Sequence, residues 1–178
     1  MEKVIDFAKT LIKNKTGDKK IAVDATCGRG NDTVFLARLF ENVYAFDIQD
    51  EAIVSTITLI NNNPFVKVIK DSHSNICTYV HDKIDAVMYN LGYLPNGDKN
   101  KTTMTDTTIS SIKDVLKLLN ADGIITIVCY PGHSEGLKES IELEKFLRTL
   151  NQKEYDVIKY DFINQINNPP YLLAVRKR

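Results

Sequence analysis

The residues best suited to chemistry lie around a glycine-rich turn over residues 24–33. Gly28 and Gly30 follow the apolar residues 21–23 and precede a second apolar stretch. Glycines let the backbone turn tightly and approach a ligand without interference from a Cβ atom. The order predicts a buried strand, a ligand-binding loop and the start of a helix. Asn31, Asp32 or Thr33 can cap that helix.

Two carboxylates indicate which nucleotide-type ligand this turn suits. Thr33 stands where a third glycine would complete a dinucleotide fingerprint, which ordinarily holds a pyrophosphate. Asp24 would repel a pyrophosphate but attract the amino group of S-adenosylmethionine. Asp47, at the end of the next expected strand, can accept hydrogen bonds from two ribose hydroxyls. Each signal alone is weak, because such glycines can form a plain turn and such acids can cap helices. Together they favour a methyl donor over NAD.

Length and composition are those of an ordinary globular protein, and we expect one domain over residues 1–178. The 23 basic and 23 acidic residues balance, so no strong overall field attracts nucleic acid. No apolar run reaches the length of a membrane span and no signal peptide is recognisable, which predicts a cytoplasmic protein. The three cysteines are widely spaced, so we expect them to be buried or nearly so, with no disulfide framework and no metal site.

Helices and strands are expected to alternate along the chain, which predicts a parallel sheet with helices on both faces. Two final strands without an intervening helix predict an antiparallel hairpin at one end. The arrangement resembles the α/β, Rossmann-like class I methyltransferase fold, a three-layer sandwich around a mostly parallel seven-stranded sheet. The expected helices cover residues 2–13, 33–40, 51–61, 76–79, 106–119 and 134–150. The first expected strand begins at residue 21, and the other strands cover residues 43–46, 66–69, 86–90, 124–130, 155–162 and 171–176.

Ligands of such sheets bind beyond the carboxyl ends of the strands, so function is sought in the residues that follow each strand. Asp71 or Ser72 can accept a hydrogen bond from the exocyclic amine of adenine, with His73 beside them, although these residues could equally cap a short helix. The residues assigned to the cofactor are Asp24, Thr26, Gly28, Gly30, Asn31, Asp32, Thr33, Asp47, Ile48, Gln49, Asp71, Ser72, His73 and Asn90.

The reaction is expected at Asn90, which follows the fourth strand. An amide there can accept a hydrogen bond from a target nitrogen, and Tyr93 can stack on a flat base. The alternative is a turn stabilised by Gly92 and Pro95 with Tyr93 packed inward. Because methyl transfer from a sulfonium is an in-line displacement, positioning can supply most of the catalysis.

Residues 168–171 spell Asn-Pro-Pro-Tyr, the adenine-N6 methyltransferase tetrapeptide, but they precede the last strand instead of following the fourth. Their position predicts a hairpin loop. Because the preceding strand is expected to run parallel to the others, that loop lies at the active edge and can reach substrate with Asn164, Gln165 and Asn168.

Several motifs together resemble the MnmM (YtqB) family, long labelled "putative rRNA methylases". They are residues 24–26 with Gly28 and Gly30, residues 90–95 with 97–99, residues 130–133 with 135–136, and Asn164 and Gln165 with the proline pair. The similarity spans nearly the whole chain. Asn96 departs from it, since a glycine is expected there and asparagine tolerates left-handed geometry less well.

The resemblance implies N-methylation of the 5-aminomethyl group on the wobble uridine of tRNA, with S-adenosylmethionine converted to S-adenosylhomocysteine. It implies that Asn90 orients the amine, Tyr93 packs on the uracil, and His133 accepts a proton or hydrogen-bonds the base. Lys99 or Lys101 would meet phosphates of the anticodon loop. The residues assigned to the substrate are Leu94, Pro95, Asp98, Lys99, Lys101, Tyr130, Asn164, Gln165 and Asn168.

Other functions stay open from the sequence alone. A methyltransferase of rRNA or of a small molecule would bind the cofactor with the same residues. The alternative from another class is a noncatalytic nucleotide- or RNA-binding module. A homodimer would present a larger surface to RNA. The sequence leaves open the tRNA species, the proton acceptor and the oligomeric state.

Overall fold

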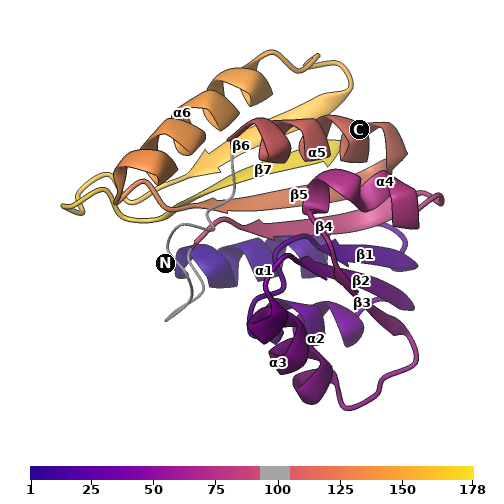
Figure 1. Ribbon diagram of the computed structural model, residues 1–178. Helices are drawn as coiled ribbons and strands as arrows, with labels where there is room; N and C mark the ends of the chain where they lie inside the picture. The colour runs from indigo at the N-terminus through magenta and orange to yellow at the C-terminus, as the bar shows by residue number, and fades with distance from the viewer. Residues whose placement is uncertain (93–104) are drawn as a thin grey trace.

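One mixed sheet organises the computed structural model, which describes residues 1–92 and 105–178 (Figure 1). The strand order is β3-β2-β1-β4-β5-β7-β6. Neighbours from β3 to β5 are parallel, whereas β7 is antiparallel to both β5 and β6. The fold prediction is therefore confirmed, hairpin included. The strands are β1 (Ile21–Asp24), β2 (Asn42–Asp47), β3 (Val66–Lys70), β4 (Ile84–Asn90), β5 (Leu119–Cys129), β6 (Tyr155–Tyr160) and β7 (Tyr171–Lys177).

Helices cover both faces of the sheet, because β4, β5 and β7 are apolar on both sides (Figure 1). On one face, Ile12 and Leu36 pack in a core with residues of β1, β2 and β4. On the other, Ile112 and Leu143 pack against β4, β5 and β7. The helices are α1 (Val4–Lys15), α2 (Asn31–Ala37), α3 (Asp50–Ile60), the 3₁₀ helix η1 (His73–Asn75), α4 (Ile76–Tyr79), α5 (Thr105–Leu118) and α6 (Ser134–Arg148).

Beyond shifts at the ends of elements and the added 3₁₀ helix η1, local details differ from the sequence prediction in three places. The strand expected from residue 124 begins earlier, at Leu119. Its pairing with β4 is irregular before Ile124, and within this stretch Asp122 has a φ of 59°. The expected caps of α2 are wrong: Gly30 is the N-cap, in the left-handed region, and no side chain caps it. Cys77 is exposed, whereas Cys27 and Cys129 are buried as expected.

The topology brings four strand ends together. The chain runs outward from β1 through β2 to β3 and then returns to β4 on the other side of β1, so β1 and β4 flank a reversal of strand order. A crevice opens at the carboxyl ends of strands at such a point. The segments after β1, β2, β4 and β5 therefore face a common space.

Gly30 is the backbone position at which the loop after β1 most depends on glycine. Its φ is +83°, and a Cβ atom there would lie 3.0 Å from the Cα atom of Thr56. We expect Gly30→Ala to lower the free energy of unfolding by about 1–3 kcal/mol in urea titrations. Gly132→Ala is the matched control, because its Cβ would come no closer than 3.7 Å to the nearest atom. Equal effects of the two substitutions would contradict this prediction.

Candidate active site

Asp24 ends β1 with its carboxylate fully buried. One oxygen accepts a 2.6 Å hydrogen bond from the hydroxyl of Thr33, and the other accepts one from the backbone N–H of Thr26 at 3.3 Å. Burial and then the nearby negative charge of Asp32 raise the pKa of Asp24 to about 7. A buried carboxylate of this kind is poised to receive a cationic group, since the partner removes the cost of ionisation.

The raised pKa of Asp24 predicts a pH-dependent stability. A pKa that is higher in the folded chain than in the unfolded chain stabilises the fold at low pH, and this contribution is lost as the pH rises toward 7. Relative to Asp24→Asn, the native chain should lose up to about 1.4 kcal/mol per pH unit between pH ~5 and ~7. Urea unfolding of both proteins across that range measures this difference. Other perturbed groups, such as His73 and Glu139, are common to both proteins. Parallel stability curves would contradict the assignment.

Asp47 anchors the glycine turn from the end of β2. One carboxylate oxygen accepts a 3.0 Å hydrogen bond from the N–H of Gly28, and the other accepts one at the same distance from the N–H of Gln49. Each carboxylate oxygen can accept a further hydrogen bond, so two acceptors remain for a diol. From α3, the hydroxyl of Thr56 donates to the carbonyl of Gly28 at 3.3 Å. Contacts from β2 and α3 thus hold the glycine turn in place.

Asn90 ends β4 opposite this turn. Its backbone N–H donates to the hydroxyl of Thr26 at 2.8 Å, and its side-chain nitrogen lies 3.4 Å from a carboxylate oxygen of Asp32. The ring of Tyr130, which follows β5, lies beside Gly92, two residues after Asn90, since a Cβ atom there would come within 3.1 Å of it. The contact with Asp32 holds the nitrogen end of the amide and thereby sets the direction of its acceptor oxygen Oδ1.

Lys9 of α1 is a member of this network that the sequence did not reveal. Its ammonium lies 2.8 Å from the second carboxylate oxygen of Asp32, and only 27% of its side chain is exposed. The ion pair gives the buried carboxylate of Asp32 a cationic partner beside Asn90. A single lysine on an amphipathic helix is ordinarily a solvated residue, and only the packing of α1 against the sheet places it at the crevice.

The residues after β3 follow the alternative prediction of a helix cap. Ser72 caps η1 by accepting from the N–H of Ser74. Desolvation raises the pKa of Asp71, but the hydrogen bonds that its carboxylate accepts from Asn75, Tyr79 and Ser72 together outweigh this and lower the pKa. Contact of Asp71 or Ser72 with adenine stays a prediction.

His73 points into the protein. It is buried with its ring edge-on to Tyr89, at 5.7 Å between centroids, and burial lowers its pKa to about 4. The imidazole is therefore neutral at physiological pH, and its side chain belongs to the core beneath the crevice. Ile48, by contrast, is 48% exposed directly after Asp47, where it can cover a flat ring.

His133 serves as the N-cap of α6, where its Nδ1 accepts a 3.0 Å hydrogen bond from the N–H of Gly136. Its Nε2 is buried, and its expected role as proton acceptor stays a prediction.

Asn164, Gln165 and Asn168 lie exposed in the loop between β6 and β7, as expected. Tyr93, Leu94, Pro95, Asn96, Asp98, Lys99 and Lys101 lie outside the described residues.

Within residues 1–92 and 105–178 there is no cluster of metal-ligating side chains. Among the helices of this same part of the chain, none has the length and apolar character needed to cross a membrane.

Comparison with solved structures places the chain among very similar folds. A putative rRNA methylase from Clostridium thermocellum is 40% identical with a TM-score of 0.95, and the match covers 100% of this chain and 99% of that one. A putative methyltransferase from Streptococcus mutans, solved in complex with SAH, is 36% identical with a TM-score of 0.92 over 100% and 99% of the two chains.

Sequence comparisons define the family. The chain is 34% identical over 159 residues to the chloroplastic tRNA (mnm(5)s(2)U34)-methyltransferase of Arabidopsis thaliana, a match over 80% of this chain and 58% of that protein. The cytoplasmic location expected for this chain stays a prediction. The family described as "Putative rRNA methylase" matches residues 43–176. The chain belongs to this rRNA methylase family.

Proposed function

We propose that this chain is an S-adenosylmethionine-dependent methyltransferase that acts on the 5-aminomethyl group of the wobble uridine in tRNA. The observation that carries the proposal is the fixed amide of Asn90, which shares the crevice with the loop after β1 and the carboxylate of Asp47. The Arabidopsis relative, which is named for a wobble-uridine modification, supports this substrate.

The residues of the crevice fit the proposed cofactor. Asp24 is a buried acceptor for an amino group, and Asp47 retains two acceptor positions for ribose hydroxyls. The positive φ of Gly28 and Gly30 lets backbone pass close to a ligand. When bound, S-adenosylmethionine supplies an electrophilic methyl group on a sulfonium.

Asn90 would orient the nucleophile. An aliphatic amine has a pKa of about 10, so it must lose a proton before its nitrogen can attack the methyl carbon. The Oδ1 atom of Asn90 can accept a hydrogen bond from the remaining N–H and align the lone pair for in-line displacement. Lys9 and Asp32 act as positioning residues, because they hold the nitrogen end of the same amide. The transfer would move the positive charge from sulfur to nitrogen, so the products are a protonated secondary amine and a thioether.

One labelling experiment tests the proposal. The protein is incubated with methyl-labelled donor and tRNA that either carries or lacks the 5-aminomethyl group, and the digested nucleosides are then separated. We expect label only in the methylaminomethyluridine of the first tRNA. Label in a ribose, in another base or in rRNA alone would identify a different RNA methyltransferase. Tight binding of the donor with no transfer to any RNA would favour a noncatalytic binding module.

A further inference from the structure

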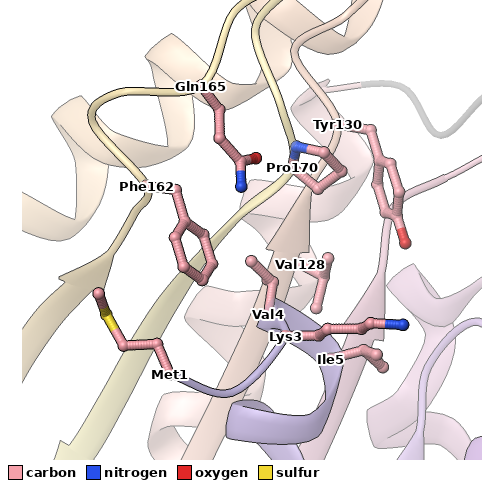
Figure 2. A pocket seen from close by; sticks show the side chains of 9 residues that line it. All are labelled: Met1, Lys3, Val4, Ile5, Val128, Tyr130, Phe162, Gln165 and Pro170. Carbon is pink, nitrogen blue, oxygen red and sulfur yellow. The ribbon is translucent and has the colours of Figure 1, made fainter.

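A pocket of about 300 Å³ lies beside the candidate active site. Its walls come from the segment that leads into α1, from the end of β5 and from the loop between β6 and β7. Figure 2 shows Phe162 and Tyr130 on opposite sides of it, with Val128 between them and the amide of Gln165 reaching inward. Lys3 adds a cation to the lining.

Contacts between distant parts of the chain hold the Phe162 wall in place. The ring of Phe162 meets that of Tyr160 edge-on, at 5.5 Å between centroids. The ring of Tyr160 in turn packs on that of Phe7, with 4.3 Å between the ring centroids. The hydroxyl of Tyr160 donates a 2.8 Å hydrogen bond to the carbonyl of Glu2. The pocket is therefore preformed, as ligand pockets usually are.

Tyr130 connects this pocket to the reacting end of the crevice. Its ring packs beside Gly92, two residues after Asn90, because a Cβ atom at Gly92 would lie 3.1 Å from the ring. Its ring also lines the pocket. A molecule seated there would touch a side chain that also packs against the segment directly after Asn90.

We propose that this pocket binds a single nucleobase of the RNA substrate, namely the base next to the methylated one on the same strand. The inference rests on the proposed function for the identity of the RNA. Aromatic rings stack on bases, the amide of Gln165 can hydrogen-bond a base edge, and Lys3 can meet a phosphate. The volume is near the lower end of the roughly 300–1,000 Å³ found for ligand pockets, so it suits one ring system.

The choice of the neighbouring base follows from the position of Tyr130 between the two places. The proposed reaction occurs at Asn90, Tyr130 packs beside Gly92 directly after it, and the same tyrosine lines the pocket. Single-stranded RNA is recognised with its bases splayed apart and stacked on aromatic side chains. Two consecutive bases can thus be separated by Tyr130, one at Asn90 and the other against Phe162.

Fluorescence of 2-aminopurine tests this assignment without requiring turnover. Short oligoribonucleotides carry 5-aminomethyluridine with 2-aminopurine on its 5′ or its 3′ side, and they are titrated with protein saturated with S-adenosylhomocysteine. We expect strong quenching for one neighbouring position. Phe162→Ala should weaken RNA binding about tenfold or more and remove most of that quenching. Ile163→Ala is the matched control, because Ile163 is 97% exposed and does not line the pocket.

Several results would overturn the inference. They are no quenching at either neighbouring position, quenching only when 2-aminopurine replaces the target base, and equal behaviour of Phe162→Ala and Ile163→Ala. Unchanged binding of S-adenosylhomocysteine by Phe162→Ala shows that the variant is folded. If the wild-type protein does not methylate aminomethyluridine but the Phe162-dependent quenching persists, the proposed reaction is wrong and the base pocket stands. Methylation without such quenching refutes the pocket alone.

Discussion

Asn90→Ala is expected to reduce kcat at least about 100-fold while leaving the affinity for S-adenosylhomocysteine within roughly threefold. The backbone N–H of Asn90 donates to Thr26, and this contact survives the substitution. Asp32 also keeps its ion pair with Lys9. The variant therefore loses only the amide that aligns the nucleophile. Single-turnover kinetics on aminomethyl-bearing tRNA, together with calorimetric titration of S-adenosylhomocysteine, measure the two quantities.

The matched control is Asn120→Ala. Its side-chain amide also donates to a buried carboxylate, that of Asp85, at 2.6 Å, but it lies where β5 begins, at the opposite end of the sheet from Asn90. We expect this variant to lose stability and to keep its kcat. If Asn90→Ala retains turnover within tenfold of the native enzyme, Asn90 does not orient the reacting amine.

The fold could be predicted because its signals are local. Apolar runs such as Ile124–Cys129 read as buried strands, and glycines and acids mark their ends. The irregular start of β5 could not be predicted, because Asp122 and Gly123 spell an ordinary turn. Their actual conformation depends on pairing between β4 and β5, which joins residues more than 30 positions apart.

The positions of the expected site residues could be predicted only for those that stand at the ends of strands. Asp24, Asp47 and Asn90 each end a parallel strand, so sheet topology alone brings them to one edge. Lys9 escaped prediction because it reaches the crevice through the packing of α1, which no local motif encodes. His73 is a case where the strand end positions the backbone but packing decides the side chain: it turns into the core, and its contact with the cofactor stays a prediction.

Removal of the Asp47 carboxylate should weaken binding of S-adenosylhomocysteine more than 100-fold. The proposed diol contacts involve a charged acceptor, and each such hydrogen bond contributes about 1.5–3 kcal/mol. Asp47→Ala also leaves the N–H groups of Gly28 and Gln49 without the carboxylate that orients them. We therefore expect a second effect, a loss of about 1–3 kcal/mol in the free energy of unfolding. Calorimetric titration and urea unfolding separate the two.

Asp50→Ala provides the matched comparison for Asp47→Ala. Asp50 begins α3 three residues later, its side chain is 78% exposed, and it pairs with Lys70 across 2.6 Å on the surface. Exposed pairs of this kind contribute little, so we expect neither affinity nor stability to change appreciably. If Asp47→Ala binds S-adenosylhomocysteine as well as Asp50→Ala does, the ribose is held elsewhere, and the orientation proposed for the methyl donor in this crevice fails with it.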